Sequence, residues 1–160
     1  MKLIEVNKSN LKLLLNNLRE EDKVELKNAY QKNYKNKFIK ITLETNEKYF
    51  VGDDNFFPLA IGGVEQTANE YYKIGQVWLI SSNRFNKNNI KLIKFIKDKI
   101  EDFKENYEIL FNTIYKSNYD SLKWLKKCGF NVLEFEDNKD YKLFYFTKGG
   151  IDFDLRYITR

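Results

Sequence analysis

The sequence predicts a single domain of the α/β (α+β) class. Its 160 residues suit one domain with a core of its own, and 42% of them are hydrophobic. Strand and helix signals follow each other in the order β-α-α-β-β-β-α-β-α-β-β, without an internal repeat or a low-complexity linker. We therefore expect one domain over residues 1–150 and a strand-like tail over residues 151–160, where apolar and polar residues alternate.

The first part of the chain indicates a short strand and two helices. Residues 3–6 form the strand, and Ser9 or Asn10 can cap a helix whose apolar residues recur every three or four positions. These apolar residues are Leu11, Leu14, Leu15 and Leu18. Acidic residues at 20–22 suit the N-terminus of a second helix. Residues 38–44 alternate apolar and polar side chains, which favours a strand and leaves a helix open.

The middle of the sequence indicates a β-hairpin. Residues 48–51 and 57–65 form its strands, and the polar residues 52–55 form the turn. Gly62 and Gly63 within the second strand predict a bulge or a close approach of another backbone.

The second half gives clearer signals. The apolar run Val77-Trp78-Leu79-Ile80 indicates a buried strand, and the longest predicted helix follows it with apolar residues at helical spacing. Gly129 marks the end of a short helix. The predicted elements are strands over residues 71–82, 109–115, 131–135 and 141–146, and helices over residues 86–107 and 118–127.

The composition excludes several kinds of chemistry. The sequence has no histidine, which removes Ser-His and Cys-His nucleophile pairs, histidine bases and nearly every catalytic zinc site. Its one cysteine, Cys128, has no partner for a disulfide within the chain and no histidine to activate it, so we expect it to be inert. Catalysis must therefore use carboxylates, tyrosines, lysines, serines or backbone amides.

The net charge of +5 does not by itself indicate a nucleic-acid surface. Lysine supplies nearly all the positive charge, whereas nucleic-acid surfaces favour arginine. Acidic and basic residues alternate through residues 97–105, which is typical of a solvated helix face. No stretch approaches the roughly 20 apolar residues of a membrane span, and the first residues do not resemble a signal peptide. We expect a cytoplasmic protein without a nucleic-acid or membrane partner.

One segment carries a recognisable motif. It reads Asn118-Tyr-Asp-Ser121-Leu-Lys-Trp124-Leu125-Lys-Lys-Cys-Gly129-Phe130 and follows the long helix and a strand. Together with the element order, it resembles the GCN5-related N-acetyltransferase (GNAT) superfamily, in which Asn, a small residue and Gly-Phe stand at these offsets. The resemblance implies a GNAT-like domain with a mixed central sheet flanked by about four helices. Two parallel strands, here about residues 74–82 and 109–115, would be splayed apart.

A narrower likeness concerns the GNAT-like proteins of tailed phages, which include a small internal virion protein of short-tailed phages. It rests on residues 18–22, on the Val77-Trp78-Leu79 strand and on the Trp124-Leu125 pair. This likeness implies a location within a phage particle as the alternative to the cytoplasm.

The family resemblance implies acetyl-CoA as the cofactor. Its pantetheine arm pairs with the first splayed strand, and its pyrophosphate meets the N-terminus of the long helix. The family's phosphate loop begins with arginine or glutamine and continues with small residues. Here Arg84 stands first, while Lys87 and Asn89 take the places of the small residues. The implied cofactor-binding residues are Leu79, Ile80, Ser81, Arg84, Lys87, Asn89 and Asn118.

The resemblance also implies the catalytic groups of an acyl transfer. A carboxylate deprotonates the amine, a backbone amide stabilises the developing charge, and a tyrosine protonates the leaving thiolate. Glu65 and Glu70 are the candidate bases, although both also suit solvated strand ends. At the family's tyrosine offset this chain has Leu125, so Tyr115 and Tyr119 are the candidate acids.

Two functions therefore stay open. The first is an acyltransferase that moves an acetyl group from acetyl-CoA to an amine on a small molecule or a protein. The second is a catalytically degenerate GNAT-fold protein that serves as a phage virion or interaction component. In that case residues 151–160 would bind a phage or assembly protein by adding a strand to its sheet.

Overall fold

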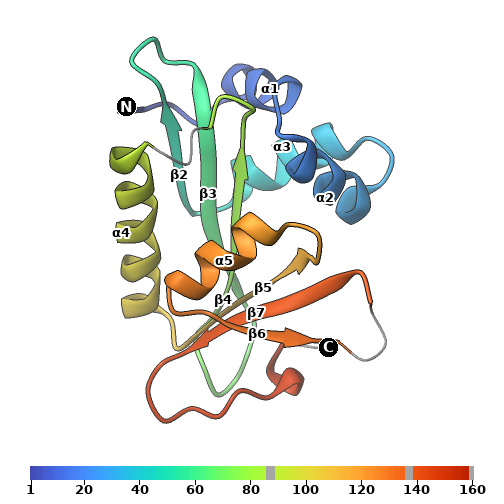
Figure 1. Ribbon diagram of the computed structural model, residues 1–160, viewed down its shortest axis with the longest axis vertical. Coiled ribbons are helices and arrows are strands. Elements are labelled where there is room, and N and C mark those ends of the chain that lie inside the picture. The colour runs from blue at the N-terminus through green and yellow to red at the C-terminus, as the bar shows by residue number, and fades with distance from the viewer. Residues whose placement is uncertain (86–88, 136–138, 159–160) are drawn as a thin grey trace. The chain divides into compact units, whose positions relative to one another are not determined.

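The computed structural model describes residues 1–85, 89–135 and 139–158 (Figure 1). Within these residues the strands form one mixed seven-stranded sheet in the order β1-β2-β3-β4-β5-β7-β6. The strands are β1 (Lys2–Leu3), β2 (Glu47–Gly52), β3 (Pro58–Thr67), β4 (Ile74–Ser81), β5 (Ile109–Tyr115), β6 (Asn131–Glu134) and β7 (Tyr141–Thr147). The helices are α1 (Lys8–Asn16), α2 (Glu20–Tyr30), α3 (Tyr34–Glu44), α4 (Ile90–Asn106) and α5 (Tyr119–Lys127), and a 3-10 turn, η1, covers Leu155–Tyr157.

The contacts divide the chain into two compact units. The first consists of Met1–Val64 and Trp78–Ile93, and the second of Glu65–Val77 and Lys94–Arg160. β3, β4 and α4 each begin in one unit and end in the other. The predicted boundary near residue 150 between domain and tail stays a prediction.

In the first unit, α1, α2 and α3 lie next to one another and pack on the sheet (Figure 1). The leucines expected to share one helix face are all buried, three in α1 and Leu18 just after it. The cap prediction was wrong, because Asn7 caps α1 in place of Ser9 or Asn10. Its side chain accepts a hydrogen bond from the backbone N of Asn10 at 2.9 Å.

The strand interpretation of residues 38–44 was also wrong, since they belong to helix α3. The buried residues of this helix are Phe38, Ile39 and Thr42, which is the spacing of a helix face. The apparent alternation came from Ile41 and Leu43, which are half-buried and exposed respectively. The local sequence of residues 38–44 fits a strand and a helix equally well, and tertiary packing selects the helix.

The predicted hairpin is present as β2 and β3. Gly62 and Gly63 keep a regular register, and the irregularity lies between Val51 and Gly52, so the bulge prediction at the two glycines was wrong. The close approach is confirmed. A Cβ on Gly63 would lie 2.5 Å from the backbone O of Glu47, a distance that excludes any side chain.

In the second unit, β5 lies between a parallel and an antiparallel neighbour. β4 pairs with it only from Ile74–Ile109 to Gln76–Phe111, whereas β7 pairs along its whole length. β6 adds to the other edge of β7. The bounds predicted for β5 are confirmed as residues 109–115, and those of β6 and β7 are correct to within one residue.

The end of α5 shows why Gly129 stands where it does. Gly129 has a φ of +80°, which favours glycine. Its backbone N donates to the Lys126 O at 3.0 Å, and the backbone N of Phe130 donates to the Leu125 O at 3.1 Å. This pair of bonds is a Schellman motif, and it satisfies carbonyls that the helix end leaves unpaired.

The strand predicted for the tail is absent among residues 151–158. Ile151, Phe153, Tyr157 and Ile158 instead pack against a cluster that contains Ile74, Ile109, Phe111 and Leu143. The ring of Phe153 stacks on that of Tyr145 with centroids 4.0 Å apart. The alternating apolar residues therefore pack within the second unit.

Among the described residues, no helix is both long and apolar enough to cross a membrane. The same residues contain no cluster of three side chains suited to hold a metal ion.

Candidate functional site

The predicted cofactor residues of the first unit lie at the end of β4. Leu79 and Ile80 belong to the strand, and Ser81 is its last residue. Ile80 is part of the core of this unit, whereas Leu79 is half-buried. Ser81 and the following Ser82 are buried, so the strand ends on two hydroxyl groups that need partners inside the protein.

The connection between α1 and α2 pairs with this strand end. The backbone N of Arg19 donates to the Ser81 O at 3.1 Å, and the backbone N of Asn83 donates to the Asn17 O at 2.7 Å. An isolated antiparallel bridge lies between these two bonds. The first residues of the turn after β4 are thereby fixed by backbone pairing.

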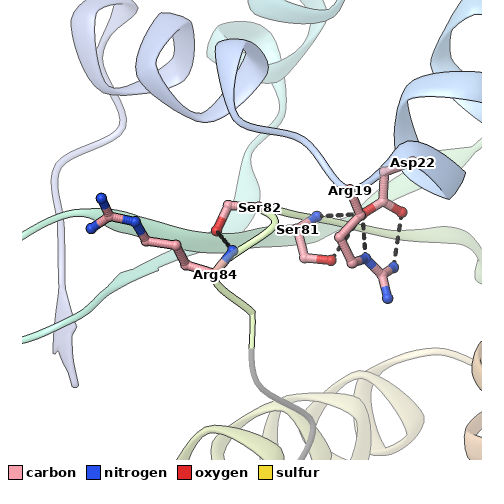
Figure 2. A network of polar contacts seen from close by, with 5 residues as sticks. All are labelled: Arg19, Asp22, Ser81, Ser82 and Arg84. Atoms are coloured by element: carbon pink, nitrogen blue, oxygen red, sulfur yellow. Dashed lines mark hydrogen bonds and ion pairs between the residues drawn. The ribbon is translucent and has the colours of Figure 1, made fainter.

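A buried carboxylate adds to that attachment. Asp22, in the first turn of α2, accepts hydrogen bonds at Oδ2 from the backbone N of Ser81 at 2.9 Å and from its Oγ at 2.8 Å. Arg19 binds both oxygens of the same carboxylate, from Nε at 2.9 Å and from Nη2 at 3.0 Å (Figure 2). Asp22 is 2% exposed, and four donors satisfy its charge.

The electrostatics of Arg19 follow from this pair. Burial by itself lowers the pKa of the Arg19 guanidinium, but the hydrogen bond and the charge of Asp22 raise it above its ordinary value. Arg19 therefore stays a cation and neutralises the buried carboxylate.

Arg84 lies three residues beyond the strand end and has a different environment. Its backbone N donates to Ser82 Oγ at 3.3 Å, and its guanidinium carbon lies 3.8 Å from the centre of the Phe57 ring. Figure 2 shows that its side chain extends away from the Arg19–Asp22 pair. Arg84 is exposed, and within the described part of the chain no carboxylate pairs with it. It is a cation held in place by stacking and open to an anion.

Asn89 begins α4. Its Oδ1 accepts a hydrogen bond from the backbone N of Leu92 at 3.2 Å, and its backbone O accepts from the N of Ile93 at 3.0 Å. Asn89 is thus the N-cap of the helix. Lys87 lies outside the described residues.

In the second unit, the predicted residues gather at the connection from β5 to α5. The backbone N of Asn118 donates to the Tyr115 O at 2.9 Å, and its O accepts the N–H of Leu122 at 3.0 Å. Asn118 is buried, and Tyr119, the first residue of α5, is 72% exposed. The Tyr115 ring packs edge-on against Tyr141, with centroids 5.4 Å apart.

The candidate bases lie elsewhere in this unit. Glu65 is an exposed residue near the end of β3, and Glu70 is exposed in the loop between β3 and β4. Both carboxylates are accessible to a diffusing amine.

The position at which the resemblance places a tyrosine is apolar. Leu125 is buried in the second unit, and its neighbour Trp124 has a buried indole N–H without a hydrogen-bond partner among the described residues. Neither Trp124 nor Leu125 has a hydroxyl group for proton transfer.

Solved structures similar to this chain are N-acetyltransferases. Spermidine N-acetyltransferase from Vibrio cholerae, in complex with CoA and spermine, matches with a TM-score of 0.62 and 14% identity, over 91% of this chain and 94% of that chain. The N-acetyltransferase PseH of Campylobacter jejuni, in complex with acetyl coenzyme A, matches with a TM-score of 0.54 and 17% identity, over 92% and 99% of the two chains. An acetyltransferase of the GNAT family from Bacillus anthracis matches with a TM-score of 0.62 and 8% identity, over 89% and 90%.

The chain has the GNAT fold. No protein-family model matches the sequence, and no curated protein is similar to it at the level of sequence. The GNAT fold expected from the element order and from the segment of residues 118–130 is therefore confirmed by structure alone.

The predicted cofactor-binding and catalytic residues belong to both units. Leu79, Ile80, Ser81, Arg84 and Asn89 belong to the first, and Glu65, Tyr115, Asn118 and Tyr119 to the second. Sequence reasoning missed Asp22 and Phe57. The sequence places an arginine three residues before Asp22, which indicates an ion pair. That spacing is common on helix surfaces, so it does not indicate that the pair is buried.

Proposed function

We propose that this protein is an N-acyltransferase that moves an acetyl group from acetyl-CoA to an amine. The observation that carries the proposal is the fold, which covers 91% of this chain in the match to an acetyltransferase bound to CoA and spermine. Fold alone does not decide activity, so the proposal also depends on the chemistry of the residues at the strand and helix ends.

The first unit has groups that fit a pyrophosphate. Arg84 supplies an exposed cation, and Asn89 caps the helix whose N-terminal end favours anions. We propose that Arg84, Lys87 and the backbone around Asn89 bind the phosphates. The backbone of Leu79 and Ile80 would pair with the pantetheine arm, whereas the N–H and the O of Ser81 are already bonded to Asp22 and Arg19. Asn118, in the second unit, is a further proposed cofactor-binding residue.

When bound, acetyl-CoA supplies the acetyl thioester. In the proposed reaction Glu65 accepts the proton that the attacking amine loses as its nitrogen bonds to the acetyl carbon. Tyr115 or Tyr119 gives a proton to the sulfur when the carbon–sulfur bond breaks. A backbone N–H of β4 stabilises the charge on the acetyl oxygen during the attack.

Ligand binding tests the first part of the proposal. Acetyl-CoA at about 1 mM should raise the melting temperature, because a ligand that binds only the folded state stabilises it. Arg84→Ala and Lys87→Ala should weaken binding in calorimetry, whereas Lys32→Ala, an exposed lysine after α2, should leave the affinity unchanged. Wild-type protein without a shift or a binding signal would overturn the proposal.

Release of free CoA thiol tests the transfer itself. A panel of amines that includes spermidine and spermine should give a signal that depends on both acetyl-CoA and the amine. Glu65→Gln and the double variant Tyr115→Phe with Tyr119→Phe should lower kcat without abolishing CoA binding. Glu105→Gln, at an exposed acid of α4, is the matched control for the exposed carboxylate.

The buried Leu125 favours a second candidate, in which the fold has lost catalysis and serves as an interaction component. This function predicts that the protein, with or without CoA binding, releases no thiol with any amine of the panel. It also predicts a stable complex with another protein of the same assembly.

A further inference from the structure

Asp22 lies in the first turn of a helix, where acidic residues are usually exposed, yet its carboxylate is buried and bonded to another segment of the chain. The carboxylate is 2% exposed, and its oxygens accept from Arg19 and from both the N–H and the hydroxyl of Ser81 (Figure 2). Oδ2 accepts three of these hydrogen bonds and Oδ1 accepts one, and burial separates the carboxylate from solvent. Asp22 therefore acts through the residues it holds.

Asp22 holds Ser81, which lies directly before the turn that leads to Arg84. The backbone of Ser81 is fixed by Asp22 on its N–H and by the backbone N of Arg19 on its O. Ser82 is fixed next, because its N–H donates to the Leu59 O at 2.8 Å and its Oγ accepts from the N–H of Arg84 at 3.3 Å. Hydrogen bonds at Ser81 and Ser82, joined by the peptide bond between these residues, therefore link Asp22 to the backbone of Arg84.

A buried ion pair is a weak source of stability, because desolvation offsets much of the attraction between the charges. Such groups are retained in some proteins because they fix one conformation. Here the conformation in question is that of the turn Ser81–Arg84, which presents a stacked, exposed guanidinium at the phosphate end of the proposed site.

We infer that Asp22 is a positioning residue for phosphate binding: through Ser81 it sets the turn that presents Arg84 to the pyrophosphate of CoA. The inference rests on the proposed function. It adds a residue of α2 to the phosphate-binding residues, which the family resemblance places only in the loop after β4.

A comparison of CoA with pantetheine distinguishes a role of Asp22 in phosphate binding from a role in stability alone. CoA carries the pyrophosphate, whereas pantetheine has the same arm without phosphates. Calorimetry with the full chain should show that Asp22→Asn weakens CoA binding by about tenfold, the loss of one charge-assisted contact. Pantetheine affinity should stay within about twofold of wild type. Glu21→Gln, an exposed acid in the same helix turn, is the matched control and should change neither affinity.

A double-mutant cycle tests the route through Arg84. Arg84→Met should weaken CoA binding selectively, and adding Asp22→Asn to it should cause little further loss, because both act on one contact. If Asp22→Asn fails to fold, Ser81→Ala replaces it in the cycle. That variant removes one of the four hydrogen bonds of the carboxylate and keeps the ion pair.

The outcomes separate the two proposals. Equal CoA affinity in wild type and Asp22→Asn, or equal losses for CoA and pantetheine, would overturn the positioning role while the proposed function stands. Additive losses in the cycle would also overturn it. Wild-type protein that binds neither CoA nor acetyl-CoA would overturn the proposed function and this inference with it.

Discussion

Asn112 donates a hydrogen bond from its side-chain Nδ2 to the backbone O of Val77, 2.8 Å away. These two residues would form the next pair in the parallel register of β4 and β5, which ends at Gln76 and Phe111. Asn112 Oδ1 also accepts from Gln76 Nε2 at 3.1 Å and from the N–H of Thr113 at 2.7 Å. The side-chain amide of Asn112 therefore binds the Val77 carbonyl where the backbone pairing of β4 and β5 ends.

Asn112→Ala should lower the free energy of unfolding by about 1–3 kcal/mol, because the Val77 carbonyl and the Gln76 amide lose their partner. Urea denaturation followed by circular dichroism measures this change. Thr113→Ala is the control, since its exposed side chain should contribute less than about 0.5 kcal/mol. Equal losses in the two variants would show that the Asn112 side chain does not support the strand pair.

The Asn112 contact also shows which structural features the sequence does not predict. Local patterns located β5 at residues 109–115 and the glycine that ends α5, because strand alternation and helix capping depend on neighbouring residues. Asn112 and Val77 are far apart in the sequence, and no local pattern indicates that the side chain of one will end the pairing of the other. The same holds for Asp22 and Ser81. Residues 38–44 were misread because their alternation fits a strand as well as a helix.

Gly129→Ala should lower the free energy of unfolding by about 1–2 kcal/mol, since its φ of +80° is strained for any residue with a Cβ. Thermal denaturation measures the change. The matched control is Gly149→Ala, where an added Cβ meets nothing within 4 Å and the backbone is not left-handed. A loss for Gly149→Ala as large as that for Gly129→Ala would contradict the role of the backbone conformation.

Lys104→Met should lower the free energy of unfolding by about 1–2 kcal/mol, because Lys104 Nζ donates to the backbone O of Cys128 at the end of α5. The ammonium also lies 5.0 Å from the centre of the Phe146 ring. Lys99→Met is the control, because Lys99 pairs with Asp102 on α4 at the same three-residue spacing as Lys104 with Glu101. It should cost less than about 0.5 kcal/mol, and a larger loss there would argue that surface charge alone explains both results.

Cys128 provides a test that depends on pH. Burial raises the pKa of its thiol above the ordinary value and outweighs the opposing effect of Lys97 and Lys104. The folded protein therefore keeps this proton at a pH where the unfolded chain loses it. The thiol's contribution to stability is fully present below the unfolded pKa and is lost as pH rises through the folded pKa.

The measurement compares wild type with Cys128→Ala in urea between about pH 7.5 and about pH 10, the range in which an unfolded thiol titrates. The stability of wild type relative to the variant should decline with rising pH, at up to about 1.4 kcal/mol per pH unit. A thiol-specific reagent at about pH 8 should react slowly with folded wild type and fast in urea. Rapid reaction of the folded protein, or a difference between the two proteins that is constant with pH, would contradict burial of the thiol in the turn after α5.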